Sequence, residues 1–334
     1  METRVTLKGR SLLTLTDLSD MEFSYILDLA EQLKRKKKSG VRGHLLDGKN
    51  IALIFEKSST RTRCAFVVAA SDEGATAEYL GVNDIHFGKK ETVADTARVL
   101  GRFFDGIAFR GFKQETVSQL AARSGIPVWN ALTDDWHPTQ VFADLMTVKE
   151  RFGRLSGLTF VYVGDGRNNM VNSLMFGCSR SGMRFVNCTP KELAPSSELV
   201  EQARLQARFG GTVEVIHDPR RAVDGAHVLY TDVWVSMGEE TKFAERVKLL
   251  KAYQVNQALL EATGRVKSGD LLFLHCLPAY HDDKTEVTAT SGALEVSDEV
   301  FEGPFSRVFD QAENRMHTIK AIMVATLTSE GGVS

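Results

Sequence analysis

Several features that would assign a chain to a special class of protein are missing from this 334-residue sequence. The formal net charge is only −2, so the chain lacks the charge excess that drives binding to nucleic acid or to an anionic membrane surface. No apolar run approaches the length of a membrane-spanning helix. Residues 1–14 contain Glu2 and no continuous apolar core, so we expect no secretory signal. The composition is that of a soluble globular protein, long enough for two domains.

Cysteine is scarce as well, with four residues spread along the chain: Cys64, Cys178, Cys188 and Cys276. None of them has the C-x-x-C spacing of a structural zinc site. We therefore expect reduced thiols in a cytoplasmic protein. We also expect neither a metal ion nor an organic cofactor. The one basic run, 34–38, ends a predicted helix over 18–38. Cations suit that end of a helix dipole, so a solvated helix end is favoured over a nucleic-acid patch.

Strand-like and helix-like segments alternate along the chain, which predicts parallel sheets covered by helices on both faces. The predicted strands are 50–55, 76–80, 106–110, 126–132, 158–163, 183–187, 212–216, 226–230 and 271–274, and the predicted helices are 18–38, 92–104, 115–123, 138–152, 169–181, 197–209, 240–263 and 313–329. We expect two doubly wound parallel-sheet α/β domains, 1–152 and 153–313, with the C-terminal helix 314–334 packing back on the first. Ligands bind beyond the carboxyl ends of such strands, so we expect the active site in the cleft between the domains.

The motif Ser59-Thr60-Arg61-Thr62-Arg63 follows the first predicted strand and opens a helix-patterned segment. Free backbone N–H groups at a helix start favour an anion. Acidic residues suit the first turn of a helix, yet this one carries two arginines against the dipole, and a bound phosphate would compensate them. The motif alone is equally compatible with a solvated helix start capped by Ser58 or Ser59.

Two further polar clusters follow strands of the first predicted domain. Arg110 ends the third strand, and Gly111 after it leaves room for a ligand or a turn. The segment from His137 to Gln140 follows the fourth strand and opens a helix. Its imidazole and amide suit donation to a carbonyl oxygen, whereas its proline and threonine alone are typical of a plain helix start.

In the second predicted domain, the segment from Gly164 to Asn169 resembles half of a dinucleotide-binding fingerprint. Its third position is Asn169 rather than glycine, and the next strand ends in Asn187 where a ribose-binding acid would stand. A nicotinamide-dependent enzyme is therefore disfavoured. The consecutive amides Asn168 and Asn169 at a helix start suit a carboxylate instead.

Three more polar segments complete the pattern. Asp232 follows a strand and offers a carboxylate for an ammonium group, and we expect Trp234 beside it to serve packing. Cys276 also follows a strand, although a cysteine alone is more often a small buried residue than a nucleophile. Glu313 begins the last predicted helix, which would place the cation of Arg315 in its first turn, against the dipole.

Together these motifs resemble those of ornithine carbamoyltransferases, in the aspartate/ornithine transcarbamylase family. The motifs are Ser59–Arg63, His137–Gln140, Asp232–Gly238, His275–Pro278 and Glu313–His317, in that order along nearly the whole chain. The first two are shared among transcarbamylases, and the segments around Ser236 and Cys276 point to ornithine. The resemblance implies transfer of the carbamoyl group of carbamoyl phosphate to the δ-amine of L-ornithine. The products would be L-citrulline and phosphate, in arginine metabolism.

The resemblance also implies the site residues. The phosphate of carbamoyl phosphate would contact Ser59, Thr60, Arg61, Thr62 and Arg110, its carbamoyl end His137, Gln140, Cys276, Leu277 and Arg315, and ornithine Asn169, Asp232, Ser236 and Met237. The catalytic groups among these would be Arg110, His137, Asp232 and Cys276. Family members form trimers in which a loop from the neighbouring subunit completes each site. Here that loop would be Asn83–Gly88, with His86 where the family often has glutamine.

Two other functions remain open at this point. The amine could be putrescine or an acylated ornithine, although the former has no α-carboxylate and the latter no ammonium charge. The chain could also be a catalytically silent amino-acid-binding protein on the same scaffold, which would need neither the phosphate motif nor Cys276.

Overall fold

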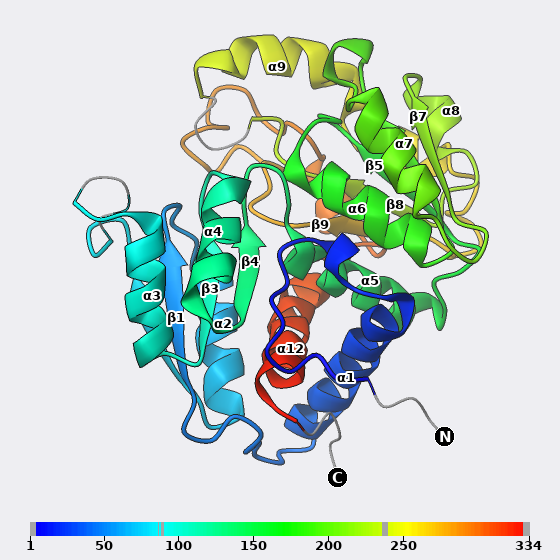
Figure 1. The fold of residues 1–334 in the computed structure, drawn as a ribbon. Coiled ribbons are helices and arrows are strands. Elements are labelled where there is room, and N and C mark those ends of the chain that lie inside the picture. The colour runs from blue at the N-terminus through cyan, green and yellow to red at the C-terminus, as the bar shows by residue number, and fades with distance from the viewer. Residues whose placement is uncertain (1–4, 86, 88–89, 236–239, 330–334) are drawn as a thin grey trace. The chain divides into compact units, whose positions relative to one another are not determined.

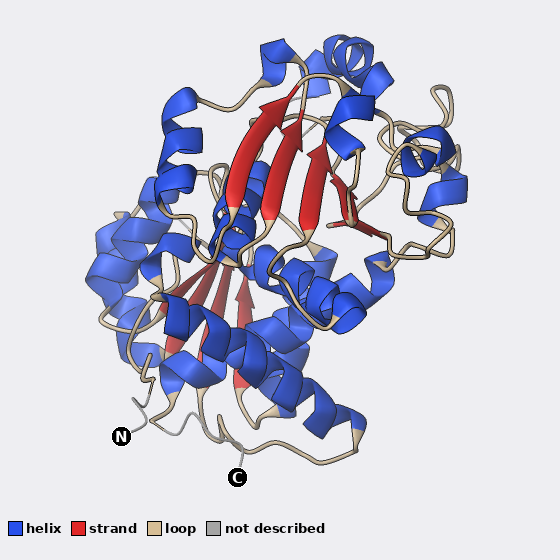
Figure 2. Cartoon of the chain, turned by 90° about the vertical axis from the view of Figure 1, so that its right-hand side faces the viewer, coloured by secondary structure: helices blue, strands red, loops and turns tan. Residues whose placement is uncertain are grey.

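A computed structural model describes residues 5–85, 87, 90–235 and 240–329. Its contacts divide the chain into two compact units, one of Met1–Met146 with Glu313–Ser334 and the other of Thr147–Ala312. The boundaries lie inside two helices, α5 (Pro138–Phe152) and α12 (Val308–Leu327). Each unit contains one parallel sheet with helices around it (Figures 1 and 2). The predicted class of two parallel-sheet α/β domains is therefore confirmed.

The sheet of the first unit has the strand order β2-β1-β3-β4. Its strands are β1 (Asn50–Phe55), β2 (Thr76–Leu80), β3 (Gly106–Arg110) and β4 (Val128–Leu132). Besides parts of α5 and α12, its helices are α1 (Asp20–Lys38), α2 (Thr60–Asp72), α3 (Val93–Phe103), α4 (Gln114–Ser124) and a 3₁₀ turn at Leu15–Asp17. The central strands β1 and β3 are buried on both faces, as their unbroken apolar runs predict.

The sheet of the second unit has the order β7-β6-β5-β8-β9. Its strands are β5 (Thr159–Val163), β6 (Arg184–Cys188), β7 (Thr212–Ile216), β8 (Val228–Thr231) and β9 (Leu272–His275). Its helices are α6 (Asn169–Arg180), α7 (Ser197–Leu205), α8 (Pro219–Val223), α9 (Phe243–Leu250), α10 (Gln257–Glu261) and α11 (Asp298–Phe301), with 3₁₀ turns at Lys191–Leu193, Glu240–Lys242 and Lys251–Tyr253.

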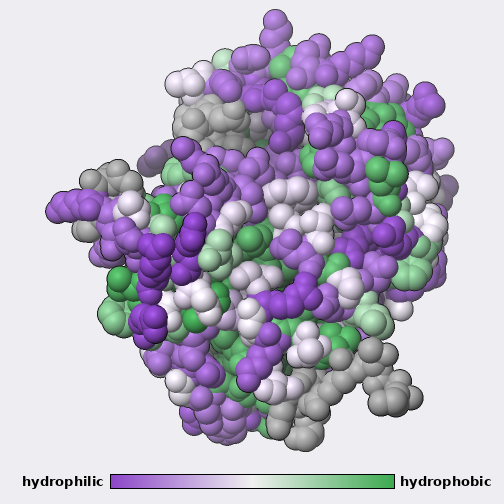
Figure 3. All heavy atoms as spheres, in the orientation of Figure 1, coloured by the Kyte–Doolittle hydropathy of each residue, from purple (hydrophilic) through white to green (hydrophobic). Residues whose placement is uncertain are grey.

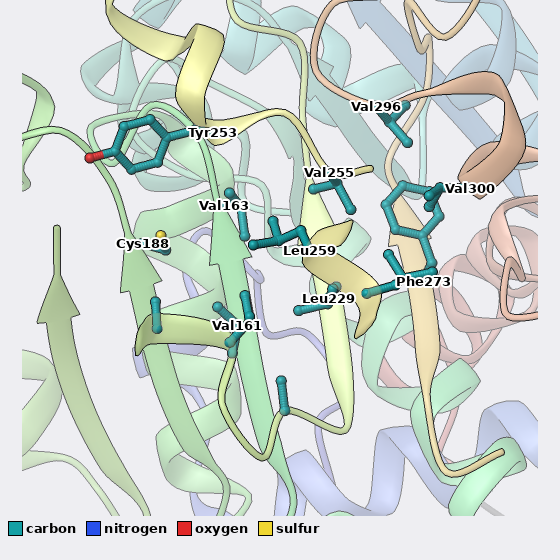
Figure 4. Packing of buried hydrophobic residues seen from close by; sticks show 14 of the residues in the cluster. Val161, Val163, Cys188, Leu229, Tyr253, Val255, Leu259, Phe273, Val296 and Val300 are labelled. Atoms are coloured by element: carbon teal, nitrogen blue, oxygen red, sulfur yellow. The ribbon is translucent and has the colours of Figure 1, made fainter. Parts of the chain in front are cut away.

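Figure 4 shows part of the buried core of the second unit. Alternate residues of β5, β8 and β9 pack against side chains from the segments around α10 and α11, and the labelled members are Val161, Val163, Cys188, Leu229, Tyr253, Val255, Leu259, Phe273, Val296 and Val300. The Tyr253 hydroxyl donates a hydrogen bond to the His217 carbonyl oxygen, 2.6 Å away. Trp234 belongs to the same cluster, which confirms that it serves packing.

The helical region predicted over 240–263 is present but is not one continuous helix, because the chain forms α9, α10 and two 3₁₀ turns there. The break centres on Val255, whose N–H donates to Glu295 O at 2.9 Å and whose carbonyl accepts from Ser297 N at 3.0 Å. This bridge takes the backbone groups of Val255 out of the helical pattern. The short helices α8 and α11 were not predicted.

The predicted start of the last helix is also wrong. α12 begins at Val308 rather than Glu313, so Arg315 lies two turns into the helix. The expectation that its cation opposes the dipole in the first turn therefore fails, because the dipole acts mainly at a helix terminus.

The basic run at the end of α1 is used inside the first unit. Lys34 Nζ donates to Asn314 Oδ1 at 2.7 Å, Lys37 Nζ pairs with Asp72 at 2.6 Å, and Lys38 Nζ lies 3.4 Å from Glu313. These lysines connect α1 to the end of α2 and to α12, which lies beside α1 in Figure 1. The run is thus a helix end, as predicted, but its lysines are paired within the unit rather than only solvated.

On the face drawn in Figure 3, hydrophilic residues cover most of the surface and apolar residues are interspersed among them. No helix in the described part of the chain has both the length and the apolar character needed to cross a membrane. All four cysteines are free thiols.

Candidate active site

The motif at Ser59 forms the junction that its pattern predicts, because β1 ends at Phe55 and α2 begins at Thr60. Ser59 is the N-cap residue: its Oγ accepts from Thr62 N at 3.3 Å and donates to Thr62 Oγ1 at 3.1 Å. No acidic residue stands in the first turn of α2. The half-buried Arg61 and the hydroxyls therefore surround a helix N-terminus whose dipole favours an anion.

The strand order places two further polar clusters at the same end of the sheet as the Ser59 motif. β1, β3 and β4 are neighbours and run parallel, so the residues that follow them share one end of the sheet. Arg110 ends β3 and is 7% exposed, and His137 stands just before α5 and is 4% exposed. The glycine after Arg110 has a different use from the one predicted. A Cβ at Gly111 would lie 2.2 Å from Glu56 Oε2, so Gly111 accommodates a neighbouring side chain rather than a ligand.

Arg315 joins this cluster from α12. Its Nη1 lies 3.4 Å from Thr62 Oγ1, and its side chain is buried. Burial, together with the guanidinium groups of Arg315 and Arg110, holds the pKa of His137 well below its usual range. His137 is therefore neutral at physiological pH, and a neutral imidazole can donate one N–H to a carbonyl oxygen without adding charge.

Gln140 is oriented by Asp144, one turn further along α5. Its Nε2 donates to Asp144 Oδ1 at 2.6 Å. Because a carboxylate only accepts, this bond distinguishes the NH₂ group of the Gln140 amide from its carbonyl oxygen. The Gln140 Oε1 atom is buried and accepts no hydrogen bond from the described residues. An oxygen of this kind requires a donor such as the NH₂ of a carbamoyl group.

In the second unit, Asp232 and Cys276 follow the neighbouring strands β8 and β9. Cys276 Sγ donates to Asp232 Oδ1 at 3.0 Å, and Val233 N donates to the same oxygen at 2.8 Å. Burial raises the pKa of Asp232, although nearby His275 and Cys276 offset part of the effect. None of the described lysines or arginines forms an ion pair with this carboxylate. An incoming ammonium group would therefore offset the free-energy cost of desolvating its negative charge.

The loop that carries Cys276 is shaped by His275. Leu277, which has a φ of +59°, donates its N–H to His275 Nδ1 at 2.9 Å. The ring proton must then be on Nε2, which donates to the buried Glu295 Oε1 at 3.2 Å. Glu295 was missed at the sequence level, since an isolated acid after a 20-residue interval carries no pattern. Asp232, His275 and Cys276 could hold a metal ion, their ligand atoms lying within 4.8 Å. Both ring nitrogens of His275 are already used, however, which favours a hydrogen-bonded cluster.

The two consecutive amides at the start of α6 have different roles. Asn168 is the N-cap: its Oδ1 accepts from Val171 N at 2.9 Å, and its Nδ2 donates to Tyr162 OH at 2.7 Å. The same Nδ2 lies 3.5 Å from Asp232 Oδ2. Asn169 is the first residue of α6 and is partly exposed, at the dipole end that attracts a carboxylate.

The structure thus gathers the predicted residues in two sets. One set, in the first unit, contains Ser59, Thr60, Arg61, Thr62, Arg110, His137, Gln140 and Arg315; the other, in the second unit, contains Asn169, Asp232, Cys276 and Leu277. His86, Ser236 and Met237 lie outside the described residues.

Comparisons with known proteins show which family both parts of the chain resemble. Residues 10–150 match the model of the aspartate/ornithine carbamoyltransferase carbamoyl-P binding domain, and residues 156–326 match that of the Asp/Orn binding domain. The chain is 57% identical to a catabolic ornithine carbamoyltransferase of Bacillus licheniformis, over 98% of this chain and 99% of that protein. It is 58% identical to one of Enterococcus faecalis, over 96% of each.

A solved structure is similar as well. The ornithine carbamoyltransferase of Pyrococcus furiosus matches with a TM-score of 0.89 and 41% identity, covering 99% of this chain and 100% of that one. The chain belongs to the aspartate/ornithine carbamoyltransferase family.

Proposed function

We propose that this protein transfers the carbamoyl group of carbamoyl phosphate to the δ-amine of L-ornithine, giving L-citrulline and phosphate. The observation that carries the proposal is that the buried His137, whose pKa is lowered by burial and by the nearby guanidinium groups of Arg315 and Arg110, stands at the same end of the sheet as the helix N-terminus at Ser59. Cations that bind a phosphate beside a neutral donor for a carbonyl oxygen are what a carbamoyl phosphate site requires.

The first domain, 1–152 with the C-terminal segment 314–334, binds carbamoyl phosphate. Its phosphate contacts are Ser59, Thr60, Arg61, Thr62, Arg110 and, from the loop 83–88, His86. The carbamoyl end contacts His137, Gln140, Cys276, Leu277 and Arg315. Here the Gln140 Oε1 accepts from the carbamoyl NH₂, which satisfies its buried lone pairs.

The second domain, 153–313, binds ornithine. Asp232 holds the α-ammonium, and Asn169 with the backbone N–H of Met237 holds the α-carboxylate. Ser236 belongs to the same set. Asp232 is partly buried, and its carboxylate suits a cation because binding replaces the hydration that burial removes.

In the reaction, the δ-amine attacks the carbamoyl carbon and the bond to the phosphate oxygen breaks. The amine must arrive neutral, although a free alkylamine has a pKa of about 10. The departing phosphate is a base and takes the amine proton, so no protein base is needed. His137, Arg110 and Thr62 donate to the carbamoyl oxygen as charge develops there, each donor contributing about 3–4 kcal/mol if oxyanion-hole values apply.

A colorimetric citrulline assay tests this proposal. The protein is given carbamoyl phosphate with L-ornithine, putrescine or Nα-acetyl-ornithine in turn. We expect product with L-ornithine only, because the other two lack a partner for Asn169 or for Asp232. Turnover of putrescine or of the acylated amine in preference to ornithine would reject the substrate assignment. The absence of product with all three would favour a silent binding protein.

We further propose a cytoplasmic enzyme that assembles as a trimer or a multiple of trimers. Light scattering of the purified chain tests the assembly, and the mass of a monomer or a dimer would contradict it. The two relatives described above are catabolic by name, and we propose that this chain likewise serves arginine breakdown. A deletion strain should then still grow without arginine and lose only its ability to use arginine. Arginine auxotrophy would contradict this role.

A further inference from the structure

Asp165 and Arg246 form a buried ion pair in the second unit. Arg246 Nη1 lies 3.1 Å from Asp165 Oδ2, and the two side chains are 5% and 10% exposed. Asp165 stands in the turn between β5 and α6, and Arg246 lies in the middle of α9. The other carboxylate oxygen of Asp165 accepts from the backbone N–H of Arg167 at 3.0 Å. The carboxylate therefore connects its own turn to a helix much later in the chain.

Gly166, the next residue of this turn, packs against the segment that follows β6. Gly166 N donates to Thr189 Oγ1 at 3.0 Å, and a Cβ at Gly166 would lie only 2.8 Å from Leu193 O. The turn is thus packed against the segment after β6, and the Asp165–Arg246 pair holds it against α9. Asn168 and Asn169 follow directly, so their position depends on this turn.

The other end of the pair lies on α9, the first α-helix after Asp232 along the chain. Asp232 begins the connection from β8 to α9, and α9 packs onto the core of the unit through Val247 and Leu250. The ion pair therefore connects α9 to the turn that presents Asn169.

The Asp165–Arg246 pair also changes the balance of charge near Asp232. Asp165 and Asp232 are both close enough to Tyr162 to raise the pKa of its hydroxyl, after burial, which is the largest cause. Two acids therefore lie near Tyr162. The guanidinium groups of Arg246 and of Arg167, whose Nε lies 3.3 Å from Asp165 Oδ1, compensate the first of them. The second, Asp232, remains available to a cation.

From these contacts we propose that Asp165 and Arg246 are positioning residues for the amino-acid substrate. Their ion pair fixes the turn that presents Asn169 to the α-carboxylate. Of the two acids near Tyr162, it leaves Asp232, which pairs with none of the described lysines or arginines, available to the α-ammonium. This inference rests on the proposed function.

Kinetics of Arg246→Gln test the inference, with citrulline formation by the unaltered protein measured first. We expect the KM for ornithine to rise about tenfold or more, since misplacing a bound group by 1 Å can cost about a hundredfold. The KM for carbamoyl phosphate should stay within about twofold, because its proposed phosphate site draws on the other unit. Arg246→Lys keeps the charge, so its KM for ornithine should lie between that of the wild type and that of Arg246→Gln.

A double variant separates charge from packing. Asp165→Asn with Arg246→Gln removes both charges, so it should recover part of the ornithine KM that Arg246→Gln alone loses. If Arg246→Gln fails to fold, the double variant and Arg246→Lys carry the same comparison of the two KM values. Arg184→Gln is the matched control. It breaks the ion pair between Arg184 and Glu214 at 2.7 Å in the same unit, and it should alter neither KM.

The outcomes separate this inference from the proposed function. If the unaltered protein makes no citrulline from ornithine, the proposed function fails and the inference fails with it. If it does make citrulline, and the folded variants keep the wild-type ratio of the two KM values, only the inference is overturned. An equal rise in both KM values would also overturn it, because that result indicates a general structural role.

Discussion

Cys276 Sγ donates a 3.0 Å hydrogen bond to Oδ1 of Asp232, across the ends of two neighbouring parallel strands. The thiol and the backbone N–H of Val233 use one carboxylate oxygen, while the amide of Asn168 lies 3.5 Å from the other. Burial raises the pKa of this carboxylate, so the ligand-free protein holds a destabilised acid at the place where a substrate cation is expected. Such strain in the free state is typical of sites built for binding.

Asp232→Asn should therefore weaken ornithine binding and strengthen the fold. The KM for ornithine should rise about a hundredfold or more, since losing one partner of a buried charge pair costs about 2–5 kcal/mol. Because the folded-state pKa is raised, the native state binds more protons than the unfolded state above about pH 3.9, and stability falls as pH rises through that window. Removing the charge should therefore raise the Tm of the ligand-free protein at pH 8. An unchanged KM for ornithine would contradict the assignment.

His137 should destabilise the protein in acid. Its folded-state pKa is well below the unfolded value of about 6.5, so the unfolded state binds the extra proton as pH falls through 6.5. Stability is therefore lost below that pH, by about 1.4 kcal/mol for each further pH unit until His137 itself titrates. Urea unfolding of the wild type and of His137→Asn at pH 5.5 and pH 8 measures this difference.

A second buried histidine acts in the same direction, since burial lowers the pKa of His317 to about 4. His137→Asn should therefore remove only part of the acid sensitivity. The same substitution should lower kcat by about 10²–10³ if the imidazole donates to the carbamoyl oxygen. If NMR showed that His137 itself titrates near pH 6.5, that result would contradict its role as a neutral donor.

Arg61→Ala and Arg63→Ala form a matched pair at the start of α2. Arg61 is half-buried beside the proposed phosphate site, whereas Arg63 is exposed and its guanidinium carbon lies 3.8 Å from the centre of the Tyr79 ring. Losing one charge-assisted contact to phosphate should raise the KM for carbamoyl phosphate at least about tenfold in Arg61→Ala. Arg63→Ala should change that KM little. Normal turnover by Arg61→Ala would reject the phosphate site.

The ion cluster at Asp72 should respond asymmetrically to mutation. Asp72 accepts from Lys37 at 2.6 Å and from the buried Lys320 at 2.7 Å. Asp72→Asn leaves Lys320 buried without this carboxylate, which should cost about 3–5 kcal/mol of folding free energy. Lys37→Met removes a partly exposed partner and should cost about 1 kcal/mol or less. Equal losses in urea unfolding would contradict the argument.

The same cluster sets a pH dependence. Burial opposes ionisation of Asp72, but hydrogen bonds from Lys320 and Lys37 outweigh it and lower its pKa. This stabilisation is therefore present above the unfolded pKa of about 3.9 and is lost as pH falls through the folded pKa. The acid dependence of unfolding below pH 4 should accordingly be weaker in Asp72→Asn.

The sequence alone was enough to locate the sheets and the polar segments that follow the strands. The strands at 50–55, 76–80, 106–110 and 212–216 were predicted to the residue, because their apolar character is local and bounded by turns. The same local rule failed at Val255, where a bridge to Val296 interrupts a helical pattern. It also failed for Arg315, since the helix continues upstream of the predicted start.

The class of fold, the order of the motifs and the resemblance that they carry could all be predicted from the sequence, since each depends on residues close together in the chain. Which charges meet is a property of the folded protein. It paired His275 with Glu295 and Asp165 with Arg246, and it placed His137 in the field of two arginines. The physical reason is that protonation and ion pairing depend on burial and on the distance between charges, and folding sets both for residues that the sequence keeps apart.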